Sequence, residues 1–190
     1  MPRDVDPDKR LADVAAATVQ VARTSGAHSV TIRAVATQLG GSTTLVTNYL
    51  PSRAALILNA LDHGRDRWRE ELAAALTGVS DEDRLATVIE WSLTSTSDDP
   101  VLRTLIMEIV ANAAVEPDMA ASLHRESTEF RELLRSAAAE SGFADPDDVA
   151  GLAYLLVRGA YIAATEDPEH WTDARIRDVI QGTVSAQPRS

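Results

Sequence analysis

The stretch from Thr31 to Leu56 constrains the fold more than any other part of this chain. Apolar residues at helical spacing open it and predict a short helix over 32–39. The glycine pair 40–41 then interrupts the pattern, because glycine adopts a positive φ without steric cost. Ser42 is a suitable N-cap for a second short helix over 43–49, since its hydroxyl can accept a hydrogen bond from a backbone N–H. Two short helices joined by a glycine turn are typical of a helix-turn-helix, whose second helix enters the major groove of DNA.

The rest of the sequence also predicts helices and no strand. A helix over 6–25 opens with Asp6, Pro7 and Asp8, because proline and acidic residues favour the first turn. A long helix over 52–77 follows the helix-turn-helix. The helices expected after it cover 80–95, 99–115, 117–141, 145–165 and 172–186. The start at residue 80 rests on Ser80 to Asp83, a run similar to a capping box.

These elements predict an all-α fold of about nine helices in two domains. We expect a three-helix helix-turn-helix DNA-binding domain over 1–51. We expect a larger helical domain over 52–190. Aromatic residues make up only 4% of the chain, so alanine and the aliphatic residues must form the core.

The charge of the chain is unevenly distributed. The net charge of −11 argues against a nucleic-acid partner if it is taken as a whole. However, residues 1–55 carry six basic and four acidic side chains, whereas the remainder carries 12 basic and 25 acidic ones. The local field matters more for phosphate binding than the total charge, so the pattern favours a DNA-facing part on an acidic body.

Several function classes lack their sequence signals. The chain has no cysteine, which excludes disulfides, thiolate metal sites and a cysteine nucleophile. Its four histidines are scattered without the i, i+4 pairing of a helical zinc site, and no nucleophile elbow, P-loop or dinucleotide motif is present. We therefore expect no enzyme, no metal and no cofactor. The polar N-terminus and the lack of an apolar run of about 20 residues predict a cytoplasmic protein without a membrane partner.

Four motifs stand in this part of the chain: T-I-R-A-V-A, L-G-G-S, T-T-L-V-T-N-Y-L and P-S-R-A-A-L. Together they resemble the tetracycline-repressor (TetR) family of bacterial transcriptional regulators, and the resemblance covers about residues 8–57. Four positions depart from the family pattern. Gly41 replaces a usual apolar residue, Thr44 a frequent glycine, Thr47 a common tyrosine and Arg53 the usual lysine. The change at Gly41 predicts a less tightly packed turn.

Candidate DNA-binding residues follow from the two short helices. Thr43 and Thr44 open the second one, where their hydroxyl and methyl groups can contact base edges. The resemblance implies phosphate contacts for Thr47, Asn48 and Tyr49.

Other candidates lie at helix starts. Thr31 and Arg53 stand at helix N-termini, where a phosphate is favoured, and Arg33 can reach a phosphate or a base. The alternatives stay open: Thr31 and Ser42 can be caps only, Arg33 and Arg53 solvated charges, and Tyr49 a core residue.

The last two helices carry the candidate dimer interface. The resemblance implies a homodimer in which these helices pair with their mates as a four-helix bundle, and a near-palindromic DNA operator. The interface residues we expect are Leu152, Leu156, Gly159, Ile176 and Ile180. The alternative is that these apolar stripes pack only within one chain.

The family resemblance also implies a small-molecule effector of unknown identity, and it assigns effector binding and dimerisation to the helical domain over 52–190. Trp91, Met107 and Tyr154 are the candidate pocket residues, because adaptable and aromatic side chains are common in such pockets. Plain core packing is the alternative for all three. Glu90, Glu108 and His124 are polar residues near apolar stripes that could meet a ligand.

The resulting functional hypothesis is a DNA-binding repressor that binds double-stranded operator DNA as a homodimer and is released by a ligand. Two alternatives remain: a regulator that keeps the fold but acts through protein partners, and a transcriptional activator.

Overall fold

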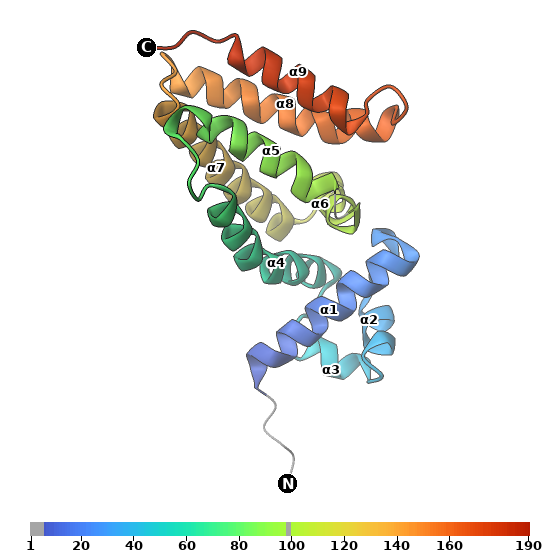
Figure 1. Cartoon of the computed structure of the whole chain (residues 1–190). Coiled ribbons are helices and arrows are strands. Elements are labelled where there is room, and N and C mark those ends of the chain that lie inside the picture. The colour runs from blue at the N-terminus through green and yellow to red at the C-terminus, as the bar shows by residue number, and fades with distance from the viewer. Residues whose placement is uncertain (1–5, 98–99) are drawn as a thin grey trace. The chain divides into compact units, whose positions relative to one another are not determined.

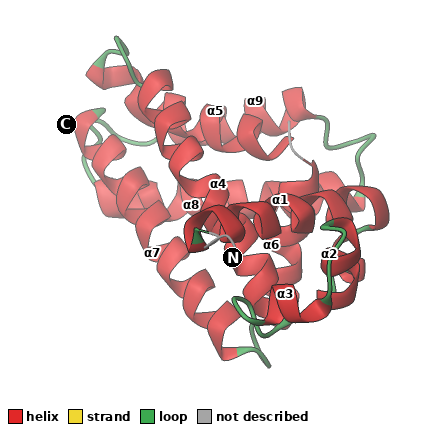
Figure 2. Cartoon of the chain, turned by 90° about the horizontal axis from the view of Figure 1, so that it is seen from below, coloured by secondary structure: helices red, strands yellow, loops and turns green. Residues whose placement is uncertain are grey.

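The computed structural model describes residues 6–97 and 100–190, and this part of the chain forms helices and loops without a strand (Figure 2). The elements are α1 (Pro7–Ser25), η1 (Ala27–Ser29), α2 (Ile32–Gln38), α3 (Thr43–Thr47), α4 (Arg53–Ala75), η2 (Asp81–Asp83), α5 (Arg84–Ser97), α6 (Pro100–Asn112), α7 (Pro117–Glu140), α8 (Pro146–Glu166) and α9 (Asp173–Ser185). Here η denotes a 3₁₀ helix. The predicted all-α fold class is confirmed.

The helix boundaries differ from the prediction at a few ends. The expected start of a helix at Ser80 is wrong, because η2 comes first and α5 begins at Arg84. The Ser80 hydroxyl makes no capping bond and instead donates to Asp83 Oδ2 at 2.6 Å. Helix α6 ends at Asn112, three residues before the expected end, and the expected start at Asp99 lies outside the described residues.

The chain divides into two compact units. Unit 1 comprises Met1–Arg69 and Pro100–His124, and unit 2 comprises Glu70–Asp99 and Arg125–Ser190. This division is by packing, and it assigns α6 to the same unit as the helix-turn-helix. The expected division at residue 51 is one of function, and it stays a prediction.

Unit 1 is held together by small and branched aliphatic side chains. Helix α1 contacts α2, and α2 contacts α3 (Figure 1). The core cluster includes Val14, Val30, Val35, Val46, Leu56, Leu105 and Ile109. Burial of each such side chain stabilises the fold by about 1.5–3 kcal/mol. Since Leu105 and Ile109 belong to α6, this helix completes the core under the helix-turn-helix.

Unit 2 is built on longer helices. Helices α8 and α9 run antiparallel and side by side (Figure 1), and both contact α5. The core cluster includes Leu85, Ile89, Leu134, Phe143, Val157 and Ile180. The C-terminal residues fold back on the α7–α8 turn, where the Ala144 amide donates to the Pro188 carbonyl and the Ser190 amide to that of Gly142.

Two kinds of feature are absent from the described residues. No helix there combines the length and apolarity that crossing a bilayer requires. In the same part of the chain, no group of three or more histidine, aspartate and glutamate side chains is arranged to hold a metal ion.

Candidate nucleic-acid interface

The turn between α2 and α3 is closed by its two glycines. Gly40 has φ +66°, a left-handed conformation that costs other residues about 1–2 kcal/mol. The Gly40 amide donates to the Thr37 carbonyl at 3.0 Å, and the Gly41 amide to that of Ala36 at 2.9 Å. A Cβ added at Gly41 would lie 3.2 Å from Leu45 Cδ1, so Leu45 fills the space beside this backbone. The turn is therefore set by backbone hydrogen bonds and by the Leu45 side chain.

The two predicted N-caps behave differently. Thr31 caps α2, since its Oγ1 accepts a hydrogen bond from the Ala34 amide at 3.1 Å. Ser42 occupies the N-cap position of α3, but its hydroxyl makes no capping bond, so the predicted capping role of that hydroxyl is wrong. Both side chains are exposed. The Ser42 hydroxyl can therefore form a hydrogen bond to a binding partner without breaking a capping bond.

Helix α3 separates an inward apolar side from an outward polar one. It has five residues, two fewer than predicted. Val46 is fully buried and Leu45 is half-buried, whereas the exposed side chains are Thr43, Thr44, Thr47 and Asn48. Residues four apart share a helix face, so these four form two adjacent rows. Such a surface offers hydroxyl and amide groups that can donate to and accept from bases and phosphates.

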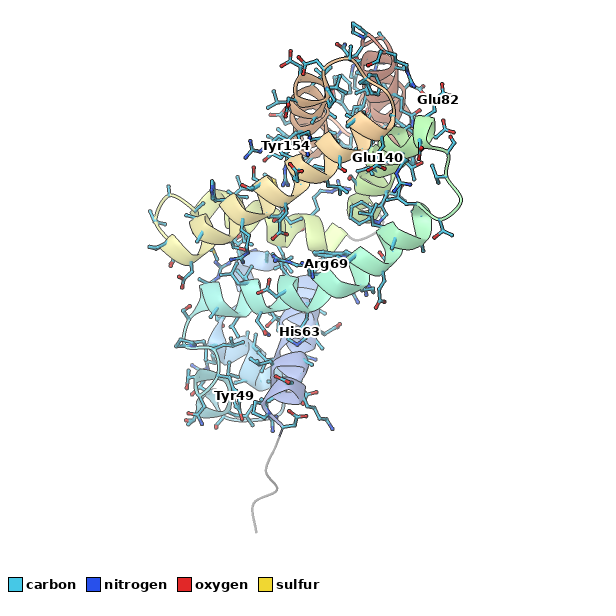
Figure 3. All side chains as sticks on the ribbon, turned by 90° about the vertical axis from the view of Figure 1, so that its left-hand side faces the viewer. Tyr49, His63, Arg69, Glu82, Glu140 and Tyr154 are labelled. Carbon is cyan, nitrogen blue, oxygen red and sulfur yellow. The ribbon has the colours of Figure 1, made fainter. Side chains whose placement is uncertain are left out.

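Tyr49 follows this surface in the chain, and Arg33 lies on the preceding helix, α2. Tyr49 is 37% exposed and lies at the outer edge of unit 1 (Figure 3), so it is neither a core residue nor fully solvated. Arg33 on α2 is exposed. Six predicted residues thus lie in one exposed segment, and their contacts with DNA stay a prediction: Ser42, Thr43, Thr44, Thr47, Asn48 and Tyr49.

Arg53, in contrast, is bound within the protein. Its Nε donates to the Val30 carbonyl and its Nη2 to the Ala27 carbonyl, both at 2.9 Å. Its Nη2 also lies 2.8 Å from Glu108 Oε1 on α6. These contacts favour a structural role for Arg53 over the phosphate contact expected from the sequence, and that contact stays untested. Because Glu108 is 55 positions away, no local pattern could have revealed the pair.

The candidate dimer residues fall into two groups. Ile176 and Ile180 are 6% and 2% exposed, within the core of unit 2, so they are poorly placed to contact a second chain. Leu152 and Leu156 are half-buried and Gly159 is exposed. Leu155, Ile162 and Val179, which belong to the same two helices but are not among the five expected interface residues, are exposed apolar residues. Their spacing was visible, since Leu155 and Ile162 lie seven positions apart on α8.

The candidate ligand-pocket residues belong to different units. Met107 lies on α6 in unit 1 and is 37% exposed. Trp91 and Tyr154 lie in unit 2. The Trp91 Nε1 is buried, and no described residue accepts a hydrogen bond from it. The Tyr154 hydroxyl is 2.9 Å from Ser127 Oγ. The pocket role of these residues stays a prediction.

Tyr154 belongs to a cluster around Arg158 that the sequence did not indicate. The Arg158 guanidinium lies 5.3 Å from the Tyr154 ring centroid and 5.7 Å from that of Phe130, and it bonds Glu126 Oε1 at 3.1 Å. Burial disfavours its charged form, but attraction to Glu126 and the hydrogen bond outweigh that effect, so the pKa of Arg158 is raised. Arg158 therefore remains charged at all physiological pH values.

A separate cavity of about 410 Å³ lies between the start of α5 and the end of α9. Its lining includes Leu85, Ile89 and Phe143, with Asp178 and Arg189 among its polar groups. None of the three candidate pocket residues lines it. Glu90, the polar residue expected near a ligand, pairs with Arg177 at 2.8 Å.

A helix-turn-helix closed by a glycine turn, in a chain that continues with further helices, is the architecture of a helix-turn-helix transcriptional regulator. Comparison with known proteins agrees. Residues 81–188, more than half of the chain, match the family model of the BetI-type transcriptional repressor C-terminal domain. The chain belongs to the TetR family of transcriptional regulators.

Solved structures share the fold over nearly the whole chain. A TetR transcription regulator from Haloarcula marismortui is similar with a TM-score of 0.83 and 18% identity, covering 95% of this chain and 98% of that one. A transcriptional regulator from Saccharomonospora viridis, solved in complex with choline, gives a TM-score of 0.76 at 17% identity, covering 96% and 99%. A regulator from Rhodococcus sp. Rha1 gives 0.76 at 19% identity, covering 95% of each chain. No curated protein sequence matches the chain.

Proposed function

We propose that this protein is a repressor that binds a near-palindromic DNA operator as a homodimer and is released by a small-molecule ligand. The observation that carries the proposal is the exposed polar surface of α3, with Thr43, Thr44, Thr47 and Asn48 turned outward. Family membership supports the same function.

The polar surface supports two kinds of DNA contact, one to base edges and one to phosphates. Thr43 and Thr44 stand in the first turn of α3 and would contact base edges. Thr47, Asn48 and Tyr49 stand at its end and would bind phosphates, which position a protein without specifying sequence. The side chains of Thr31 and Arg33 would add contacts at the start of α2. The Ser42 hydroxyl, which makes no capping bond, would add a contact at the start of α3.

The homodimer would form through α8 and α9. Leu155, Ile162 and Val179 are 69%, 50% and 42% exposed, and exposed apolar side chains on neighbouring helices are stabilised when a second copy removes them from water. Leu152, Leu156 and Gly159 on the same helix would extend the contact. A two-fold dimer presents two α3 helices, which accounts for an operator with two half-sites.

A small-molecule effector would act by favouring one of two conformations of the dimer. The complex of the Saccharomonospora viridis neighbour with choline supports an effector here without identifying it. The buried Trp91 Nε1 is a donor that a bound ligand could satisfy.

Selection of bound DNA from a random pool tests the proposal. The full-length protein is expected to enrich a near-palindrome whose binding weakens with salt, because phosphate neutralisation releases counterions. Repeating the measurement with candidate metabolites, choline included, should identify a compound that lowers affinity. If no sequence is enriched at low salt, DNA binding is disproved and the alternative of a regulator acting through protein partners gains support.

A further inference from the structure

Arg53 joins three segments of unit 1 that are distant in sequence. It is the first residue of α4, and its guanidinium bonds the carbonyls of Ala27 and Val30 and the carboxylate of Glu108. The two carbonyls belong to the segment that ends at Thr31, the N-cap of α2. A planar guanidinium suits this role, because it presents several N–H donors in fixed directions. Arg53 therefore fixes the start of α2 against the start of α4 and against α6.

Glu108 is itself held in place on α6. Its Oε1 accepts a hydrogen bond from Asn112 Nδ2 at 2.9 Å, and the same Nδ2 donates to the Glu108 carbonyl at 2.8 Å. The side chains of Arg53 and Glu108 are 31% and 22% exposed. A pair that is this sheltered is screened less by salt than a surface pair, so loss of the carboxylate leaves a poorly solvated cation.

Helix α6 packs in the same core as the helix-turn-helix, so it can influence the position of α2 and α3. Its residues Leu105 and Ile109 are buried in the cluster that also holds Val30, Val35 and Val46. Helix α6 also contacts η1 directly. The apolar core sets the general packing, but it is not directional, whereas three hydrogen-bonding contacts of one guanidinium fix the position of the segment before α2.

We propose that Glu108 is a positioning residue for DNA recognition, which acts through Arg53 on residues 27–31 and thereby on the placement of α2 and α3. The proposal rests on the DNA-binding function proposed above. Glu108 does not touch DNA in this scheme. Its carboxylate keeps the guanidinium directed at the two carbonyls, so that a polar link as well as the apolar core holds the segment before α2 against α6.

Variants of the full-length protein test this role against a matched control. Glu108→Gln removes the charge and nearly preserves the shape, and Glu116→Gln makes the same change at an exposed position in unit 1. We expect Glu108→Gln to weaken binding to the selected operator by about tenfold, as for groups that share one network, and Glu116→Gln to leave it within about twofold. Glu108→Asp, which keeps the charge but shortens the reach, should fall between them.

Two readouts separate positioning from loss of stability or of a phosphate contact. Arg53→Ala and the double variant Arg53→Ala/Glu108→Gln should bind DNA equally weakly, because Glu108 acts only through Arg53. The slope of log affinity against log salt should stay unchanged in all of them, since no phosphate contact is lost. Without DNA, Glu108→Gln should speed amide exchange over residues 27–38 and leave α8 unchanged.

The outcomes are distinct. Equal affinity of Glu108→Gln and Glu116→Gln, additive effects in the double variant, or a smaller salt slope for Arg53→Ala would overturn the positioning role while DNA binding stands. A wild-type protein that enriches no sequence would overturn the proposed function, and this inference with it. Faster exchange in every helix of Glu108→Gln would indicate a general loss of stability and would also overturn the proposal.

Discussion

The outward faces of α3 and of α8–α9 differ in chemistry. On α3 the exposed side chains are three threonines and an asparagine, whereas α8 and α9 expose Leu155, Ile162 and Val179. Hydroxyl and amide groups exchange bonds to water for bonds to a polar partner at little cost. Aliphatic side chains gain only when a partner removes them from water. This difference agrees with the proposed function, in which the first face binds nucleic acid and the second a second copy of the chain.

Two arginines show a similar contrast between the units. Arg53 and Arg158 each pair with a glutamate, at 2.8 Å and 3.1 Å. Arg53 also donates hydrogen bonds to backbone carbonyls, whereas Arg158 lies near aromatic rings. The first arrangement fixes the course of the backbone, and the second fixes the packing between α7 and α8. Residues of one type thus constrain loops in unit 1 and helices in unit 2.

The largest expected effect is a loss of dimer affinity after a substitution on the apolar face of α8 and α9. Leu155→Glu places a charge where the proposed dimer removes water, so we expect dimer affinity to fall by at least about 100-fold. DNA affinity should fall with it, because two linked half-sites no longer bind together. Sedimentation equilibrium measures the mass, and Ala139→Glu at an exposed position of α7 is the control. A Leu155→Glu protein that stays dimeric would place the interface elsewhere.

The next effect concerns the turn that presents the polar face. Gly40→Ala should destabilise unit 1 by about 1–2 kcal/mol, because alanine is strained at φ +66°. No atom lies within 4 Å of the added Cβ, so the strain is of the backbone alone. Gly182→Ala, inside α9 and equally unobstructed, should be neutral or stabilising. Thermal unfolding followed by circular dichroism compares them, and equal behaviour would contradict this account of the turn.

A smaller effect distinguishes the two N-caps. Thr31→Ala removes a capping bond and should cost about 1 kcal/mol of stability, whereas Ser42→Ala removes none. Chemical denaturation measures both. If Ser42→Ala weakens DNA binding without a change in stability, its hydroxyl belongs to the interface. A loss of stability as large as that of Thr31→Ala would show that Ser42 does cap α3.

The smallest effect is on base preference. Thr43→Val keeps the shape and removes one hydroxyl, so affinity for the preferred operator should fall by about three- to tenfold. Affinity for unrelated DNA should not change, since phosphate contacts remain. Thr77→Val, the same substitution at an exposed position in unit 2, is the control. A uniform loss over all sequences would move Thr43 from the bases to the phosphates.

Local signals were sufficient for the helices and insufficient for the contacts between them. The start of α1 follows from Asp6 and Pro7, and the end of α2 from Gly40, because these residues act within one turn. The 3₁₀ helices η1 and η2 were missed, since three residues give no periodic pattern. Ser42 and Ser80 both have the right type for a cap, but whether the hydroxyl rotates to the backbone depends on competing partners such as Asp83.

The site was predictable in composition but not in detail. The polar residues of α3 follow from their spacing against Leu45 and Val46. The burial of Ile176 and Ile180 could not be predicted from spacing, because an apolar stripe has the same pattern whether it faces its own core or a second chain. The Arg53–Glu108 pair joins positions that only the tertiary fold brings together.

The brevity of α3 has a consequence for temperature. Five residues form little more than one turn, and such a helix has no stability of its own in water. It persists only while Leu45 and Val46 stay packed on α2. Warming should therefore unravel α3 by local opening well before the long helices of unit 2 melt. A regulator with such a helix would lose its affinity for DNA at temperatures where most of its helical circular-dichroism signal remains.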